Sequence, residues 1–454
     1  MTPVLILSGG LMVLMAVVEG LHFWRTRRIT FLTVAQALIA VGYCLPPFLI
    51  AVLPGTPWAI GPHGADDPNP WGIRLYLLDL FEHLQLPEGV YLTVGIILFG
   101  AYGALLAGYG AARALSVRTF SSHHVPPGLL ALSGAALGGI AVTAMAIYAS
   151  QYDGVRDLIN MGIHVRSGTF PPKWGYLQVL AQVAFPAFLI LITAAIRMRA
   201  SMRAVVLLLA AIVWTTGMIR VLHVGGRLEL CAYLVTPLVA AMFLMRSKTT
   251  AILSMACLAV VGIFVANLPH TFSRDPFGIG MAMIQQMGTD LANHLLFTVA
   301  DFGFPHIAAA HAVTAVPDPI PFRYFTDIPL GLLYMLPNFS GVETLPPMIL
   351  SLTAKILPWI PVDLFSFGYY SLGTVGVLLT FAAFGAVLAL FDGWLTESAE
   401  WLGQALRVAW LFYLPFRLLY ADPYAALQSG FGLISGTVLI AGLALWAAWR
   451  RRGA

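Results

Sequence analysis

The stretch Ser366–Phe391, SFGYYSLGTVGVLLTFAAFGAVLALF, contains no charged side chain along its whole length. An α-helix rises about 1.5 Å per residue, so this stretch is long enough to cross the roughly 30 Å apolar core of a bilayer. Ten further stretches share its length and apolar character, and they are residues 3–24, 31–54, 91–116, 128–150, 176–196, 204–223, 228–245, 250–267, 403–420 and 425–449. The sequence therefore predicts an all-α integral membrane protein with about eleven transmembrane helices.

The composition of the chain leads to the same class of protein. Of the 454 residues, 59% are hydrophobic and 10% are charged, whereas an ordinary soluble domain has roughly 25% charged residues. The mean hydropathy is +0.85. The 24 basic and 20 acidic side chains are too few to cover a water-soluble globule of 49.0 kDa. The composition thus excludes a soluble cytoplasmic or secreted enzyme and a disordered scaffold.

Two smaller features exclude further classes. The three cysteines, Cys44, Cys231 and Cys257, are odd in number and lie in apolar runs, which argues against a disulfide framework and a cysteine-ligated zinc site. The net charge is +4, so nucleic acid is not an expected partner.

Lysine and arginine residues predict the orientation, because they concentrate on the cytoplasmic side of membrane proteins. With the N-terminus outside, every predicted cytoplasmic turn carries basic residues in it or at its edge, and Arg450–Arg452 place the C-terminus in the cytoplasm. Most acidic residues then fall in three outer segments, 55–90, 151–175 and 268–365. We treat residues 1–454 as a single polytopic membrane domain.

The outer segment 268–365 is the longest of these and is rich in proline. It also contains the apolar runs Ile279–Gln286 and Leu291–Ala300. Because proline breaks helices and fixes turns, we expect short interfacial helices that alternate with rigid turns and form a lid over the outer leaflet. The alternative is an ordinary solvated loop.

Two arginines are the main candidates for binding an anion. Arg227 follows Gly225 and Gly226 in a tight turn and stands at the start of a predicted helix, where its guanidinium and the helix dipole both favour phosphate. Arg417 lies in Leu-Pro-Phe-Arg at the outer end of the stretch 403–420. Together they could clamp a diphosphate. The alternatives are a pair between Arg227 and Glu229, contact with lipid phosphate, and an interface anchor for Arg417.

Other outer side chains are weaker candidates. Arg166, Arg323 and Arg274 could support anion binding, or they could be solvated loop charges. Tyr369 and Tyr370 fit an aromatic belt at the membrane interface and could equally stack on a sugar ring.

The candidates for a catalytic base are several. His294, His306 and His311 can accept protons near neutral pH, although core histidines are the more common case. Asp301 and Asp422 are the competing carboxylates. His306 and His311 are five residues apart, which does not place two metal ligands on one helix face, and no His-Glu-x-x-His pattern is present, so no zinc site is expected.

The order of these features resembles the Wzy-type polymerases, which link lipid-carried oligosaccharide repeat units in O-antigen and enterobacterial common antigen synthesis. The likeness rests on Arg166 in a medium outer loop, the turn Gly225-Gly226-Arg227, the large Pro-rich loop, the segment Phe367–Gly376 and the pair Phe416-Arg417. It extends over most of the chain.

The resemblance implies a GT-C-like fold and a glycosyltransferase in a bacterial inner membrane. A glycan on undecaprenyl diphosphate would pass to a sugar hydroxyl of an incoming lipid-linked repeat unit. No cofactor or metal is expected, because the lipid diphosphate is itself the leaving group. Arg227 and Arg417 would bind the diphosphate, with Arg166 and Arg323 in support. Besides membrane lipid, a chain-length-regulating co-polymerase is an expected partner.

Three other functions remain open. An O-antigen-type ligase would use the same donor with a histidine base on the large outer loop. A lipid-linked oligosaccharide flippase or other transporter would need charged residues within the membrane, and Glu19 and Arg407 lie near the cytoplasmic ends of their helices. A membrane acyltransferase would need a histidine within the membrane, whereas His223 is predicted at the outer edge.

Overall fold

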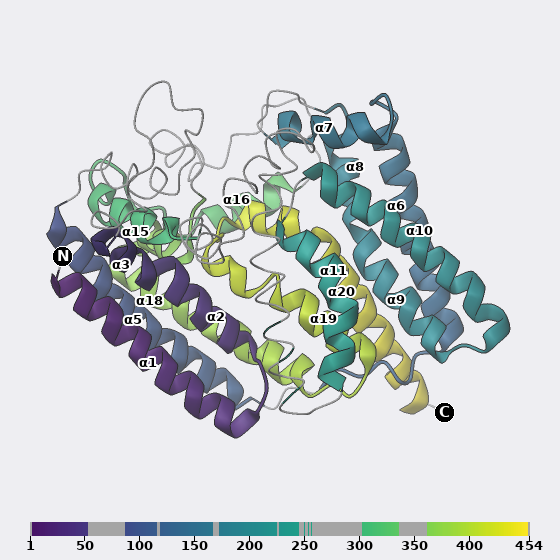
Figure 1. Ribbon diagram of the computed structural model, residues 1–454, viewed down its shortest axis with the longest axis horizontal. Coiled ribbons are helices and arrows are strands. Elements are labelled where there is room, and N and C mark those ends of the chain that lie inside the picture. Colours follow the sequence, from purple (N-terminus) through teal and green to yellow (C-terminus); the bar gives the residue numbers. More distant parts are fainter. Residues whose placement is uncertain are drawn as a thin grey trace. The chain divides into compact units, whose positions relative to one another are not determined.

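The computed structural model describes residues 2–52, 87–115, 119–166, 172–224, 227–244, 302–335 and 361–452, together with the single residues 249, 253 and 256. Within these ranges every regular element is a helix and none is a strand. This confirms the predicted all-α class (Figure 1).

Eight helices in the described ranges are long and apolar enough to cross a membrane. They correspond to eight of the predicted stretches and indicate a multi-pass membrane protein. Their bounds are Thr2–Thr26, Phe31–Phe48, Glu88–Arg113, Pro127–Ala149, Gly175–Arg197, Ala200–Val224, Leu364–Thr396 and Pro423–Arg450.

Three predicted stretches have other outcomes. The stretch 228–245 corresponds to α11 (Arg227–Leu244), in which the apolar part, Leu228–Met242, is shorter. The stretch 250–267 lies outside the described ranges except for single residues.

The stretch 403–420 is not one helix, because α19 (Trp401–Leu411) ends after 11 residues, about 16 Å, and a short 3-10 turn, η6 (Pro415–Leu418), follows. The residues of α19 from Leu402 to Leu411 are all buried. Helix α19 is therefore covered on all sides, including at Gln404 and Arg407.

The helices group into two compact units, each assembled from separate parts of the chain. Unit 1 draws on Met1–Val117, Leu291–Asp392 and Leu414–Leu427. Unit 2 draws on Arg118–Asp290, Gly393–Tyr413 and Gln428–Ala454. The single polytopic domain over residues 1–454 stays a prediction.

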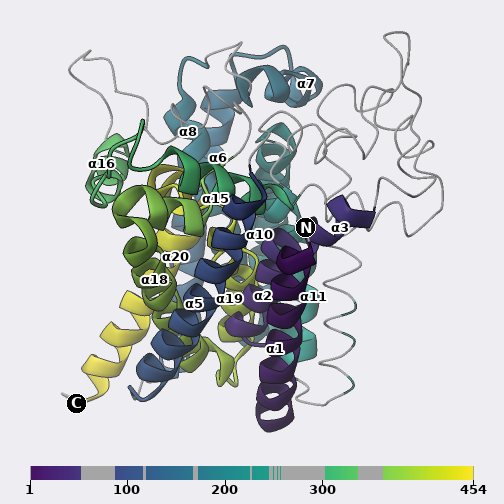
Figure 2. The same cartoon turned by 90° about the vertical axis from the view of Figure 1, so that its left-hand side faces the viewer.

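The centre of unit 1 is the pair α5 (Glu88–Arg113) and α18 (Leu364–Phe391), which lie along each other (Figures 1 and 2). Two glycines permit this contact. A Cβ on Gly108 would lie 1.9 Å from the Ala382 carbonyl oxygen, and one on Gly385 would lie 2.1 Å from that of Leu105. The backbones therefore touch where any side chain would separate them.

The N-terminal helices of unit 1 pack around this pair. Helix α1 (Thr2–Thr26) packs on α5. Helix α2 (Phe31–Ile39) runs through a π-helical turn, η1 (Ala40–Cys44), into α3 (Leu45–Val52). Cys44 is buried as a free thiol.

Helix α18 is sharply kinked near its start. Leu372 (φ −149°) and Gly373 (φ 60°) leave the helical conformation, and Gly373 takes a left-handed backbone that favours glycine. The two sides of the kink touch, since a Cβ on Gly376 would lie 2.0 Å from the Gly368 carbonyl oxygen. The predicted stretch from Ser366 is therefore helical but kinked near its start, at the glycines of Phe367–Gly376.

The described part of segment 268–365 contains two short helices. Helix α15 (Phe304–Ala315) is almost entirely buried against α18, α5 and η1, so the expected outer lid is wrong for this helix. Helix α16 (Asp327–Tyr334) exposes Ile328, Leu332 and Leu333, as an interfacial helix would. The predicted helices Ile279–Gln286 and Leu291–Ala300 lie outside the described residues.

Unit 2 is built around α6 (Pro127–Ala149), α9 (Ala184–Arg197) and α10 (Ala200–Val224). The short elements α8 (Gly175–Leu180) and η4 (Ala181–Val183) lead into α9. Helix α7 (Val155–Arg166) lies on the end of α10, where Gly162 meets the His223 backbone. Helix α19 packs on α11. Helix α20 (Pro423–Arg452) ends the described chain, and its first residues, up to Leu427, belong to unit 1.

Candidate functional site

The loop between α15 and α16 is fastened to the kink of α18. The kink leaves carbonyl groups of α18 without partners in their own helix. The Arg323 N–H donates to the Tyr370 carbonyl at 2.9 Å, and the Tyr324 N–H donates to the Ser371 carbonyl at 3.0 Å. Tyr324 (φ 51°) and Phe325 (φ 59°) both take left-handed backbone, which costs roughly 1 kcal/mol or more for each non-glycine residue.

This attachment fixes the position of Arg323. Its Nε donates to Asp327 Oδ2 at 2.7 Å, and its terminal nitrogen donates to Asp327 Oδ1. The pair is bidentate, and both side chains are less than a tenth exposed. A buried bidentate arginine has little freedom to move.

Asp422 lies beside this pair. Its Oδ1 accepts the Tyr424 N–H at 2.9 Å and so caps the start of α20, but its Oδ2 forms no hydrogen bond among the described residues. Burial, and to a smaller extent the charge of Asp327, raise the pKa of Asp422 above its ordinary value. We call Arg323, Asp327 and Asp422 the charged cluster.

Packing between α16 and α20 holds the charged cluster together. A Cβ on Gly331 would lie 2.8 Å from the Tyr424 nitrogen, and the rings of Tyr334 and Tyr424 lie 5.9 Å apart. On the other side, Phe325 and Ala421 join a small apolar core. The charged cluster is therefore built from two segments that are remote in sequence, residues 323–327 and Asp422 just before α20.

The two described histidine candidates lie in the core of unit 1. His306 is 2% exposed and stacks on Tyr91 at 5.5 Å, and burial lowers its pKa to about 4. His311 is also buried, its Nδ1 lies 3.2 Å from the Tyr370 hydroxyl, and burial lowers its pKa. Both are core histidines, and neither is presented at the surface.

The two tyrosines of the kinked helix differ. Tyr370 is buried among residues of α15 and its following turn, so an aromatic belt is wrong for this residue. Tyr369 is partly exposed and stacks on Phe365 at 6.1 Å.

The two arginines of the expected clamp belong to different units. Arg417 is half-buried in η6 of unit 1, not at the end of a transmembrane helix. Arg227 begins α11 in unit 2, and its side chain lies outside the description. The clamp stays a prediction.

Glu229, which we considered as a partner for Arg227, forms an ion pair with Arg220. Arg220 is buried and also donates to the Gln178 carbonyl at 3.1 Å. The described ion-pair partner of Glu229 is therefore Arg220.

Other candidates cannot be placed. Arg166 ends α7, but its side chain lies outside the description, and Arg274, His294 and Asp301 fall outside the described residues altogether. Among the described residues, no group of three His, Cys, Asp or Glu side chains is arranged to hold a metal ion.

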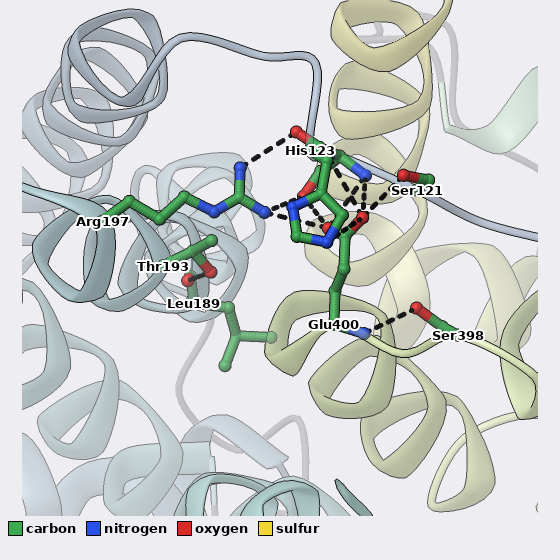
Figure 3. A network of polar contacts seen from close by, with 8 residues as sticks. Ser121, His123, Leu189, Thr193, Arg197, Ser398 and Glu400 are labelled. Carbon is green, nitrogen blue, oxygen red and sulfur yellow. Dashed lines mark hydrogen bonds and ion pairs between the residues drawn. The ribbon is translucent and has the colours of Figure 1, made fainter.

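Glu400 in unit 2 is a buried carboxylate of a different kind (Figure 3). It accepts hydrogen bonds from the Ser121 hydroxyl at 2.6 Å, from the Ser122 N–H at 2.9 Å and from the His123 N–H at 3.1 Å. It also accepts from the Ser122 hydroxyl at 2.5 Å and from Arg197 at 2.9 Å. Burial acts to raise the pKa of Glu400, but these hydrogen bonds outweigh it and lower the pKa. Such a saturated carboxylate is a structural anchor.

Two acids that were not among the predicted site residues have defined roles in the structure. Asp327 was recognisable from its spacing, since it is four residues after Arg323. Asp363 caps α18 by accepting the N–H groups of Phe365 and Ser366, and burial raises its pKa to about 6. An aspartate just before an apolar run is a helix-start signal.

Comparison of the chain with protein-family models, with curated proteins and with solved structures finds no match in any of the three.

Proposed function

We propose that the chain is a glycosyltransferase of a bacterial inner membrane that joins undecaprenyl-diphosphate-linked oligosaccharide repeat units on the outer face, as Wzy-type polymerases do. The observation that carries this proposal is the charged cluster. A fixed, buried arginine is paired with Asp327, and the charge of Asp327 acts on a second carboxylate, Asp422, of which one oxygen has no hydrogen-bond donor among the described residues. Glycosyl transfer from a lipid diphosphate needs these two groups.

The proposed reaction assigns one role to each group. The hydroxyl oxygen of the acceptor sugar bonds to the anomeric carbon of the donor glycan. The bond from that carbon to the diphosphate breaks, and undecaprenyl diphosphate leaves with the electron pair. The hydroxyl proton goes to Asp422. No metal takes part, because the diphosphate is already a good leaving group.

Arg323 would stabilise the departing diphosphate. A guanidinium has five N–H donors, and the pair with Asp327 uses two of them. The others can meet phosphate oxygens, and a fixed cation in a site of low dielectric acts strongly on charge that develops during the reaction.

Asp422 is the preferred base among the candidates. Its Oδ2 is not occupied by a described hydrogen-bond donor, and its raised pKa makes it a stronger base than an ordinary aspartate. Burial lowers the pKa of His306 to about 4 and lowers the pKa of His311 as well, so both are weaker bases than an ordinary histidine. The ligase alternative expects a histidine base, and these described histidines do not favour it.

The kink of α18 would position the arginine. Gly373 and the contact between Gly368 and Gly376 create the free carbonyls that hold Arg323 and Tyr324. The segment Phe367–Gly376, on which the resemblance partly rests, would thus act through the loop and not through substrate contact.

The test is polymerisation by the purified protein in lipid nanodiscs, supplied with lipid-diphosphate repeat units extracted from membranes of the source cell. We expect a glycan ladder from the wild type. R323K keeps the charge but loses the bidentate fork, and we expect it to lose the ladder. R156K, which alters an exposed arginine of α7, is the matched control and should keep it. A folded wild type without a ladder, or an unchanged ladder in R323K, would overturn the proposal.

A further inference from the structure

A second polar network lies in unit 1 between α1, α2 and α5. It contains Glu19 of α1, Gln36 of α2 and Tyr102 of α5. Glu19 belongs to α1, which is long and apolar enough to span a membrane. A carboxylate within such a helix is costly unless it has partners or a task. The glycosyl transfer proposed above uses none of these residues.

The partners of Glu19 are neutral side chains. Its Oε1 accepts the Thr33 hydroxyl at 2.7 Å, and its Oε2 accepts the Gln36 side-chain amide at 3.2 Å. The Gln36 oxygen in turn accepts the buried Tyr102 hydroxyl at 3.2 Å. These bonds solvate the carboxylate, but none of them supplies a positive charge.

The network continues from Thr33 to a histidine. The Thr33 and Thr30 hydroxyls lie 3.0 Å apart, and the Thr30 hydroxyl lies 3.1 Å from His22 Nε2. Thr30 and Thr33 also form the capping box of α2, in which each hydroxyl accepts the other residue's backbone N–H. The backbone donors fix the two hydroxyl oxygens in place, so the hydroxyl protons can point only along the line that joins His22, Thr30, Thr33 and Glu19.

The donor directions form one continuous row. Thr33 donates to Glu19, which leaves its oxygen to accept from Thr30. Thr30 then has no proton for His22, so Nε2 must carry the hydrogen and donate to Thr30. The row His22, Thr30, Thr33, Glu19 therefore links a group that ionises near neutral pH to a carboxylate within a predicted membrane span.

We propose that Glu19 and His22 form a proton-exchange site, in which one proton passes between the imidazole and the carboxylate through the two hydroxyls of the α2 capping box. In the forward step the protonated His22 gives its Nε2 proton to Thr30, Thr30 gives its proton to Thr33, and Thr33 gives its proton to Glu19. Neutral His22 and a protonated Glu19 result. All three hydrogen bonds are then reversed, and no atom is gained or lost.

Other charged groups surround this site. Asp392 accepts the Tyr109 hydroxyl at 2.8 Å and the Phe31 N–H at 3.0 Å, and Arg113 donates to the same tyrosine at 3.2 Å. The charge of Asp392 acts on Glu19, and that of Arg113 acts on His22. Arg25, Arg27 and Arg28 follow on the chain. The Asp392 charge disfavours an ionised Glu19 and the Arg113 charge disfavours an ionised His22, so both charges act in the direction of the forward step, towards neutral His22 and protonated Glu19.

The test is infrared spectroscopy of the full chain in nanodiscs between about pH 5 and pH 9, the range in which a histidine titrates. We expect a carboxylic acid C=O band that titrates in this range, is absent in E19Q and persists in the control E88Q, which alters an exposed acid of α5. T33V should change the band because the row is broken, and T33S should restore it.

A second readout follows His22 directly by ¹⁵N NMR of the imidazole. Loss of the Glu19 charge should lower the His22 titration midpoint by about one pH unit in E19Q. If no band titrates with Glu19 and the His22 midpoint is unchanged in E19Q, the network is only a structural clamp and the proposal is overturned. If E19Q does not fold, the comparison of T33V with T33S decides by the same criteria.

Discussion

Glu400 of unit 2 and Asp422 of unit 1 are both buried carboxylates that directly precede a helix. Both oxygens of Glu400 accept hydrogen bonds from serine, backbone and arginine donors. Asp422 caps its helix with one oxygen, while the other has no described donor. The surroundings shift the two pKa values in opposite directions. The number of hydrogen bonds, more than the residue type, separates an anchor from a candidate base.

The largest effect is expected from D422N. The amide oxygen can still accept the Tyr424 N–H, so the fold should survive, but the side chain can no longer take a proton. We expect the rate of glycan polymerisation to fall by about 10² to 10⁴ fold, the usual contribution of a general base. The measurement is the ladder formed per amount of folded protein. A rate within the range of the wild type would remove Asp422 from the chemistry.

E400A, in contrast to D422N, should lower the stability of the fold. It removes the acceptor for five described hydrogen-bond donors and leaves Arg197 without its carboxylate partner. We expect the free energy of unfolding to fall by about 3 kcal/mol, read as a lower thermal midpoint in detergent. The control E397A alters an exposed acid nearby. If E400A and E397A unfold at the same temperature, Glu400 is not an anchor.

G376A tests whether the kink of α18 positions the charged cluster. Its Cβ would meet the Gly368 carbonyl at 2.0 Å, so the two sides of the kink must move apart. We expect a loss of about 2 kcal/mol from such overpacking, together with a lower polymerisation rate. G442A has open space around its new Cβ and should change neither quantity. Equal behaviour of the two variants would show that the kink contact is dispensable.

The opposite pKa shifts predict an order of events as the pH falls. Asp422 must be ionised to act as a base, and its raised pKa means that activity declines first. The folded-state pKa of Glu400 is lowered, so its contribution to stability is present above the unfolded value of 4.5 and is lost as the pH falls through the folded value. Activity and thermal midpoint, measured on the same samples, should fall in that order. Simultaneous loss would contradict the assignment.

The smallest effect is expected from H306F. His306 is another buried titratable group, and phenylalanine keeps its stacking on Tyr91. Replacing buried polar atoms by an apolar group of similar shape is close to neutral, so we expect activity within about twofold of the wild type. A complete loss of product in this variant would favour the ligase alternative and its histidine base.

The sequence predicts the all-α class and the eight described helices that are long and apolar enough to cross a membrane, because length and apolar character are local properties. The sequence does not distinguish α19, a short helix buried in protein, from part of a membrane-spanning helix, since both kinds of helix are rich in apolar residues. The kink at Gly373 follows from glycine contacts between residues of one helix, which a periodic pattern does not display.

Only the part of the candidate site that depends on local spacing can be predicted from the sequence. The i, i+4 spacing of Arg323 and Asp327 is local and readable. Asp422 was one of several candidate bases, but its place beside Asp327 depends on packing between α16 and α20. Such contacts join residues that are remote in sequence, so local patterns do not reveal them.

The most direct test of the central claim is to count undecaprenyl diphosphate released by the purified protein from lipid-linked repeat units. Glycosyl transfer at the charged cluster predicts one lipid diphosphate for each new glycosidic bond in the wild type, and almost none in R323K and D422N. Release that is absent in the folded wild type, or that is equal in all three proteins, would contradict it.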